Sequence, residues 1–308
     1  MKRKLAFLLM LCFGWSFFLN GCGGTLPKTD DRLQVVCTIF PEYDWARQLT
    51  QGVDNVDLTL LVKNGTDLHS YQPSVRDIAM IARADVFCYV GGVSDTWVKD
   101  VLGLKAEHEL EHEHEHEHHD DEIDSHEEPP ELDEHVWLSL RRAALACTAM
   151  KEALCKADPA HEDIYNQNCT DYLQKLQELD SDFTEMTSQA ARDTIVVADR
   201  FPFRYLAEDY GLTYYAAFPG CSAETEASFE TIVFLSEKVE SLHLPCVLVT
   251  EGSNSSLAKT ILENAGSDGK ILTLQSLQAV SQKEIDAGVT YLSKMQENYD
   301  VLKQALNS

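Results

Sequence analysis

Two hydrophobic patterns alternate along the first part of the chain. Short runs of β-branched and apolar residues are separated by stretches whose apolar positions recur every three to four residues. The runs predict strands and the stretches predict amphipathic helices, an order typical of an α/β lobe with a parallel sheet. The expected strands are 34–39, 56–61 and 86–90, with helices at 44–51 and 74–84.

A long helical pattern then precedes a second α/β region. A helix is expected over 140–156, and Asp158-Pro159 opens another whose apolar positions keep a 3.6-residue period for about seven turns. A helix of this length commonly joins two bodies. After it, strands are expected at 194–198, 213–217, 246–250 and 270–274, with helices at 203–210, 228–241 and 256–265 and a final one with an apolar face from Tyr291 to Leu306.

These patterns predict an α/β fold with two lobes, each a parallel sheet flanked by helices, joined by one long bridging helix. The N-terminal lobe is expected over 32–157, the bridging helix over 158–188 and the C-terminal lobe over 189–308.

The N-terminus has the features of a secretory signal. A basic start and a short apolar run indicate a signal peptide over 1–21. The following Cys22 stands in a sequence that resembles a bacterial lipobox, so residues 22–31 are expected to form a lipidated tether. A soluble secreted protein cut near Gly21 and an uncleaved anchor are the alternatives, and all three place the folded part outside the cytoplasm.

Seven cysteines remain in the mature chain once Cys12 leaves with the signal and Cys22 carries lipid. They contain no Cys-x-x-Cys pair, and their spacing leaves any disulfide pairing open.

The negative charge of the chain limits the classes of partner that it can bind. The net charge is −26, and fifteen of the acidic residues lie between Ala106 and Glu134, where no lysine or arginine occurs. Such a surface repels phosphate backbones, which argues against nucleic-acid binding.

Within this acidic segment, residues 107–128 form a low-complexity loop that is expected to be disordered. Its imidazoles and carboxylates suit zinc without a preformed geometry, so the loop is interpreted as a weak metal collector, with a solvated acidic loop as the alternative. The histidines are His108, His112, His114, His116, His118, His119 and His126.

Two histidines outside the loop are candidate ligands. His69 follows a predicted strand and precedes a helix start, where Ser74 and Asp77 have the spacing of a capping box. His135 lies where the acidic segment gives way to apolar sequence. Loops at strand ends and helix starts commonly hold ligands rigidly.

Together the segments around these histidines resemble the paired motifs of the substrate-binding lipoproteins of zinc and manganese ABC importers. The segment 65–74 resembles the first metal motif of that family and 133–139 the second, in which a proline usually replaces Glu134. Residues 38–46 resemble the family's first strand and turn. The resemblance implies a metal between two lobes, with His69 and His135 from the first lobe and two further ligands from the second.

The second lobe departs from the family pattern. The third ligand, usually histidine or glutamate, falls on Arg200 when counted without a gap, and arginine cannot coordinate a cation. One inserted residue brings Asp199 there, so Asp199 is the predicted ligand. The fourth position, usually aspartate, corresponds roughly to Gln275. The other candidate carboxylates are Glu224, Glu226 and Glu251.

The resemblance implies a binding protein rather than an enzyme. It would capture extracellular Zn²⁺ and deliver it to an ABC permease in the membrane, attached to lipid through Cys22 at the extracytoplasmic face of a bacterial cell; a monomer is expected. Imidazole ligands favour zinc over manganese. The alternatives are a manganese receptor, and a surface metal buffer or adhesin that binds ions mainly through the loop. A zinc enzyme is the other class considered, but no predicted helix carries a His-Glu-x-x-His motif, and the chain contains no Gly-x-Ser-x-Gly.

Overall fold

The computed structural model describes residues 32–63, 66, 68–92, 94–106, 133–220 and 227–307. The signal peptide, Cys22, the tether and the seven histidines of the acidic loop lie outside the described residues, as do Glu224 and Glu226.

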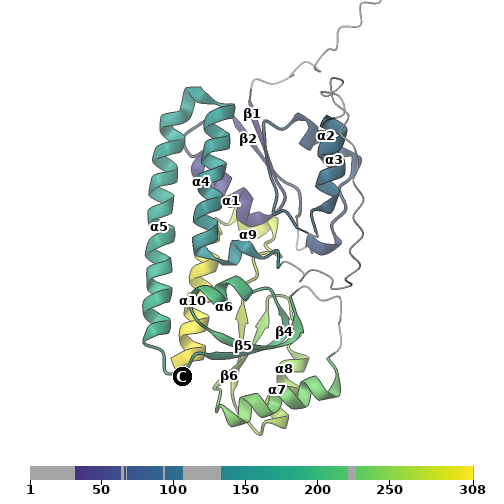
Figure 1. Ribbon diagram of the computed structural model, residues 1–308, viewed down its shortest axis with the longest axis vertical. Helices are drawn as coiled ribbons and strands as arrows, with labels where there is room; N and C mark the ends of the chain where they lie inside the picture. The colour runs from purple at the N-terminus through teal and green to yellow at the C-terminus, as the bar shows by residue number, and fades with distance from the viewer. Residues whose placement is uncertain are drawn as a thin grey trace, which may run out of the picture. The chain divides into compact units, whose positions relative to one another are not determined.

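The N-terminal lobe contains a three-stranded parallel sheet of order β2-β1-β3. Its strands are β1 (Leu33–Cys37), β2 (Val56–Leu60) and β3 (Val86–Cys88). The helices α2 (Val75–Arg83) and α3 (Thr96–Ala106) lie on the opposite side of this sheet from α1 (Phe40–Leu49), as Figure 1 shows. The strands and helices predicted for this lobe are confirmed, and α3 is a further helix that no sequence pattern predicted.

Helix α1 begins four residues before its predicted start at residue 44. Glu42 accepts hydrogen bonds from the Thr38 and Ile39 backbone amides and so caps the helix end, and Pro41 in the first turn has no amide to satisfy. The cap, rather than the apolar period, therefore sets where this helix starts.

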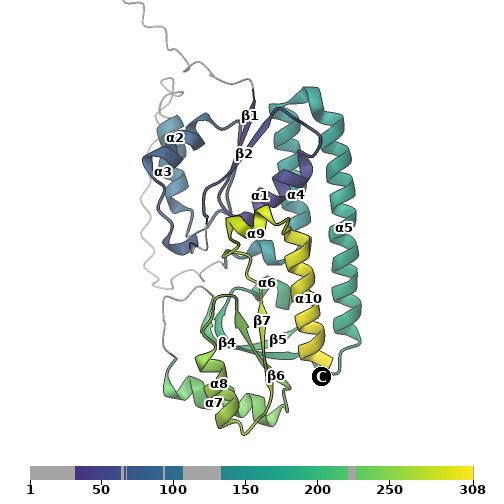
Figure 2. The ribbon, with the colours of Figure 1, turned by 180° about the vertical axis from the view of Figure 1, so that it is seen from behind.

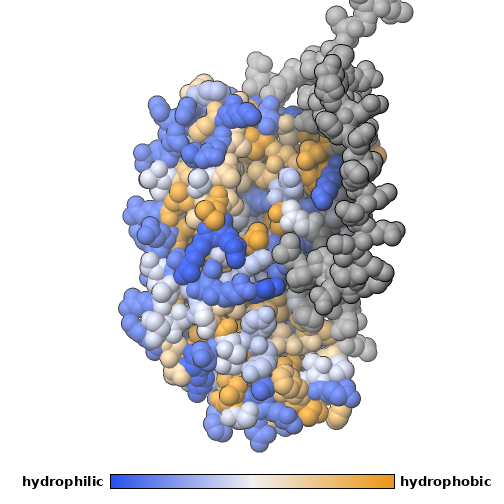
Figure 3. Space-filling model, in the orientation of Figure 1, coloured by the Kyte–Doolittle hydropathy of each residue, from blue (hydrophilic) through white to orange (hydrophobic). Residues whose placement is uncertain are grey.

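Two long antiparallel helices lie side by side next to the sheet (Figure 1). They are α4 (Leu140–Ala157) and α5 (Glu162–Ser188), joined through Asp158 and the 3-10 turn η3 (Pro159–His161). The buried face of α5 runs from Tyr165 to Met186, as its apolar period predicts. Hydrophilic residues cover much of its outer side in Figure 3. The bridging helix is confirmed, except that its first turn at Pro159 is a separate 3-10 turn.

The C-terminal lobe contains a four-stranded parallel sheet of order β5-β4-β6-β7. Its strands are β4 (Thr194–Phe201), β5 (Thr213–Pro219), β6 (Cys246–Thr250) and β7 (Lys270–Leu274). The helices between them are α6 (Arg204–Asp209), α7 (Phe229–Ser241) and α8 (Ser256–Asn264). The fold class, two parallel sheets flanked by helices, is therefore confirmed.

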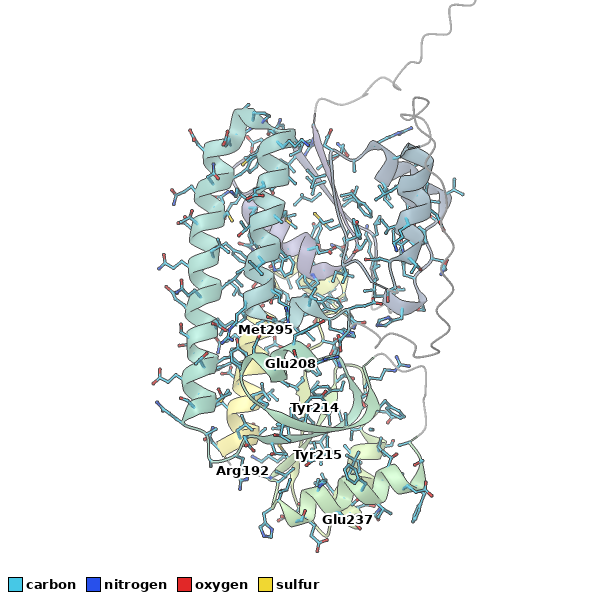
Figure 4. All side chains as sticks on the ribbon, viewed as in Figure 1. Arg192, Glu208, Tyr214, Tyr215, Glu237 and Met295 are labelled. Atoms are coloured by element: carbon cyan, nitrogen blue, oxygen red, sulfur yellow. The ribbon has the colours of Figure 1, made fainter. Side chains whose placement is uncertain are left out.

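The last two helices connect the lobes. Ile285 of α9 (Gln282–Asp286) packs with Phe40 and Leu60 of the N-terminal lobe, although its sequence position is in the C-terminal half. Helix α10 (Tyr291–Asn307) then runs past α5 to β7 (Figure 2). Met295 of α10, labelled in Figure 4, is fully buried in a core that extends from Leu33 to Leu306. One continuous core thus spans both lobes.

Six cysteines lie among the described residues, and all six are free thiols.

Candidate metal centre

The short 3-10 turn η1 (Leu68–Ser70) positions His69. Leu68 is only 1% exposed and anchors the turn in the core. Ser74 caps α2, and its reciprocal hydrogen bonds with Asp77 form the predicted capping box. The loop that carries His69 is therefore fixed at both ends.

A hydrogen bond from a neighbouring loop orients the His69 ring. Ser94 Oγ lies at hydrogen-bonding distance from His69 Nδ1, and the Ser94 amide donates to Glu134 Oε1 at 2.8 Å. Gly92 makes room for Glu134, because a Cβ at Gly92 would lie 2.6 Å from Glu134 Cγ. Glu134, which stands where the family usually has proline, thus supports His69 through Ser94. Ser94 could not be identified from the sequence, because it belongs to no recognisable motif.

His135 is held by the residue two positions before it. It is 1% exposed and precedes the 3-10 turn η2 (Val136–Leu138). Its Nδ1 lies 2.8 Å from Asp133 Oδ1, which also accepts the His135 amide at 2.9 Å. Burial opposes ionisation of Asp133, but these hydrogen bonds hold the pKa of its carboxyl below the ordinary value. An ionised partner at Nδ1 fixes the tautomer and the orientation of an imidazole ring, as is common for metal-binding histidines.

The two histidines come together in the structure. Their ring centroids are 5.6 Å apart with the planes inclined by 59°. Each ring has its Nδ1 directed to an oxygen of the N-terminal lobe. Two imidazoles at this separation can share one zinc ion at ordinary zinc–nitrogen distances.

A cavity of about 160 Å³ separates the histidines from the C-terminal lobe. On that side it is lined by residues at or just beyond the carboxyl ends of β4, β5, β6 and β7, the edge where parallel sheets commonly bind ligands. The lining residues are Thr66, His69, His135, Arg200, Pro202, Gly220, Thr250, Glu251, Ser276, Gln278 and Ala279.

At the predicted third position, the structure places Arg200 rather than Asp199 in the cavity lining. The pairing of β4 with β5 shifts register between Val197 and Arg200, and such a bulge redirects side chains. Asp199 Oδ2 accepts the Thr250 hydroxyl at 2.8 Å and its Oδ1 accepts the Arg200 amide at 2.9 Å. Asp199 therefore connects β4 to β6, and its role as a ligand stays a prediction.

At the predicted fourth ligand position, the residue in the cavity lining again differs from the one that the sequence indicated. Gln275 exchanges backbone hydrogen bonds with Asn298 of α10 and does not line the cavity, whereas Gln278 does. Glu251, a weaker candidate in the sequence, does line it. Its carboxylate accepts hydrogen bonds from the amide and hydroxyl of Ser276, at 2.7 and 2.5 Å. These residues are distant in sequence from the histidines, so no local motif indicated them.

The described residues contain no group of three or more His, Cys, Asp or Glu side chains arranged to hold a metal ion. The described part of the site therefore offers zinc two imidazoles. Among the same residues, no helix is long and apolar enough to cross a membrane.

Comparisons with known proteins agree with this architecture. A family model described as ZnuA, zinc-uptake complex component A, periplasmic, matches residues 35–305. The zinc-binding lipoprotein AdcA of Streptococcus pneumoniae R6 is 31% identical over 99% of this chain, which spans only 61% of the length of that relative. The high-affinity zinc uptake system protein ZnuA of Bacillus subtilis is 29% identical, over 97% of this chain and 96% of its own.

Solved structures of zinc- and metal-binding proteins have a similar fold. The Zn(II)-bound ZnuA-like domain of Streptococcus pneumoniae AdcA has a TM-score of 0.71 at 28% identity, covering 90% of this chain and 100% of that domain. The metal-dependent lipoprotein YcdH of Bacillus subtilis has a TM-score of 0.74 at 27% identity, covering 89% of this chain and all of that one.

Proposed function

The chain belongs to the family of the zinc-uptake complex component A, and from this premise we propose that it is an extracytoplasmic solute-binding lipoprotein for zinc. It captures Zn²⁺ between its two lobes and delivers it to an ABC permease. Its chemistry is ligand exchange, with no covalent bond made or broken, so it is not an enzyme.

The pairing of His69 and His135 carries this proposal. The two rings come from separate loops of the N-terminal lobe and meet 5.6 Å apart at a cavity whose other wall belongs to the C-terminal lobe. The carboxylate of Asp133 orients the His135 ring, and Ser94 orients the His69 ring. Two neutral imidazoles favour zinc over manganese, which prefers oxygen ligands.

Cys22 carries the lipid that keeps the receptor at the outer face of the cell membrane. The permease partner follows from the printed role of the family as a component of a zinc-uptake complex. The seven histidines of residues 107–128 collect zinc weakly near the tight site. Asp199 is kept as a candidate third ligand, to be tested beside the histidines.

Calorimetric zinc titration of the chain without residues 1–22 and 107–128 tests the proposal. One tight site is expected. His69→Ala and His135→Ala should each weaken it at least about 100-fold, about 2.7 kcal/mol, because each removes one of the protein's nitrogen ligands. His161→Ala is the matched control: His161 bonds to Asp158 outside the cavity, so its loss should leave the affinity unchanged.

Two outcomes would change the assignment. Loss of all zinc binding with the deletion of 107–128 would identify a metal buffer that acts through the loop. An Asp199→Asn protein that loses affinity as the histidine variants do would make Asp199 a ligand, whereas unchanged affinity would leave it as the connection between β4 and β6.

A further inference from the structure

Two cysteines lie opposite each other in the sheet of the N-terminal lobe. The parallel pairing of β1 with β3 aligns Cys37 with Cys88, the last residues of the two strands. Neighbouring strands are about 4.8 Å apart, and the α-carbons of disulfide-bonded cysteines are usually about 4.4–6.8 Å apart. The spacing of the two strands therefore suits a disulfide bond between these residues.

Both cysteine side chains lie on the same face of this sheet. Cys37 belongs to the main core cluster and Cys88 packs against that cluster, on the face that α1 covers (Figure 1). Val36 and Phe87, one residue earlier in each strand, pack in a different cluster on the opposite face. Because side chains alternate between the two faces of a sheet, this arrangement places both sulfurs on one side.

The two thiols interact with each other. A hydrogen bond with the Cys88 thiol raises the pKa of Cys37 well above its ordinary value, and burial raises this pKa further. Cys37 is fully buried, whereas Cys88 is half-buried. A reagent from solution therefore reaches Cys88 first, and Cys37 lies behind it as the group that completes a bond.

The other described cysteines are arranged differently. Cys147 and Cys169 come from α4 and α5, and Cys169 Sγ donates to the Cys147 carbonyl oxygen at 3.8 Å. Cys246 of β6 is aligned with Lys270 of β7. Among the described residues, only Cys37 and Cys88 are cysteines aligned in neighbouring strands.

We propose that Cys37 and Cys88 are a site of oxidative modification, at which a low-molecular-weight disulfide converts the two thiols to a disulfide bond that joins β1 to β3. The inference goes beyond zinc capture and relies only on the extracytoplasmic location, where disulfides form and persist. The bond lies at the start of the loop that carries Ser94, the residue that orients His69.

The reaction is a thiol–disulfide exchange. The Cys88 thiolate attacks one sulfur of the oxidant RSSR, which forms a mixed disulfide and releases RS⁻. The Cys37 thiolate then attacks Cys88 Sγ and releases a second RS⁻. The two protons that the cysteines lose pass through solvent to the two RS⁻ groups, so RSSR is reduced to two RSH as the protein is oxidised.

Peptide mapping after oxidation tests the inference. The chain without residues 1–22 keeps every described residue and contains seven cysteines. It is reduced, freed of reductant and zinc, and incubated with oxidised glutathione. Mass spectrometry is expected to find two peptides linked through Cys37 and Cys88. The melting temperature should rise by at least about 5 °C, because the bond closes a loop of about 50 residues in the unfolded chain.

Two substitutions provide the comparison. Cys88→Ser should abolish both the link to Cys37 and the rise in melting temperature. Cys155→Ser is the matched control, because Cys155 is also half-buried but lies on α4, so its loss should leave both unchanged.

Three outcomes would overturn the inference. They are the absence of any link in the unmodified protein, links that join only other cysteines such as Cys147 and Cys169, and a bond between Cys37 and Cys88 that fails to raise the melting temperature. Mapping of the unmodified protein needs no substitution, so the test holds even if a variant does not fold. Zinc affinity is measured separately by the titration, so the proposed function stands or falls independently.

Discussion

At the scale of single residues, Glu42 shows how burial changes a carboxyl group. It is 6% exposed and accepts hydrogen bonds from Thr38 Oγ1 at 2.9 Å and from the Thr38 amide at 3.1 Å. Burial raises its pKa from 4.5 to about 7, although these hydrogen bonds oppose the shift. The folded protein therefore holds this proton more tightly than the unfolded chain does, and the stability that the proton contributes is lost as pH rises from 4.5 towards 7.

Glu42→Gln should remove this dependence, because glutamine keeps an acceptor but carries no charge. Relative to the variant, the unmodified protein is expected to lose up to roughly 3 kcal/mol between pH 5 and pH 8, the value of a shift of about two units. Urea unfolding of both zinc-free proteins at the two pH values measures the difference. Glu152→Gln, at an exposed position of α4, is the control. A difference that stays constant with pH would contradict the prediction.

At the scale of elements, helix α10 connects the two lobes through hydrogen bonds from two of its residues. Its first amide, at Tyr291, donates to the buried Asp44 carboxylate of α1 at 2.7 Å. Two turns later the fully buried Asn298 side chain accepts from the Gln275 amide at 2.7 Å and donates to the Gln275 carbonyl at 2.9 Å. Asn298 thus satisfies the backbone just beyond β7, at the edge of the cavity.

Asn298→Ala should destabilise the protein by about 1–3 kcal/mol, because it leaves the partly buried amide and carbonyl of Gln275 without the Asn298 partner. Gln296→Ala, an exposed change on the same helix, should cost much less. Chemical denaturation of the two variants beside the parent provides the comparison. Equal stability of both variants would mean that water replaces the Asn298 hydrogen bonds without loss.

At the scale of the whole described molecule, the lobes are joined by more than the bridging helix. Trp137 Nε1 donates to the Ser276 carbonyl at 2.8 Å, and Tyr205 Oη donates to the Asp133 carbonyl at 2.8 Å. Tyr291 Oη donates to the Trp137 carbonyl at 2.6 Å. With α5, α10 and a continuous core, these contacts resist a hinge motion, since a hinge needs a few residues that change conformation freely.

Small-angle scattering should therefore give the same radius of gyration for the zinc-free and zinc-loaded protein, within error. Trp137→Phe removes one hydrogen bond between the lobes while retaining an aromatic ring, and it should leave the zinc-free form more expanded than the loaded one. A clear decrease in radius when the unmodified protein takes up zinc would refute the rigid arrangement.

Much of the fold was predictable from sequence because strands, helices and caps depend on neighbouring residues. The apolar periods placed β6 and β7 at their observed bounds, and the buried face of α5 followed from its 3.6-residue period. The positions of His69 and His135 also depend on neighbouring residues. The buried Leu68 fixes the turn that carries His69, and Asp133, two residues before His135, holds the His135 ring.

The partners of these histidines across the cavity depended on the tertiary structure alone. A register shift in β4 decides that Arg200 rather than Asp199 lines the cavity, and strand pairing of this kind involves residues far apart in the chain. Ser94 joins Glu134 and His69 only because the segments that carry these three residues, which are distant in sequence, come together in the fold. The sequence by itself determined most of the elements and the two imidazoles, whereas the residues that face them across the cavity depended on packing between the lobes.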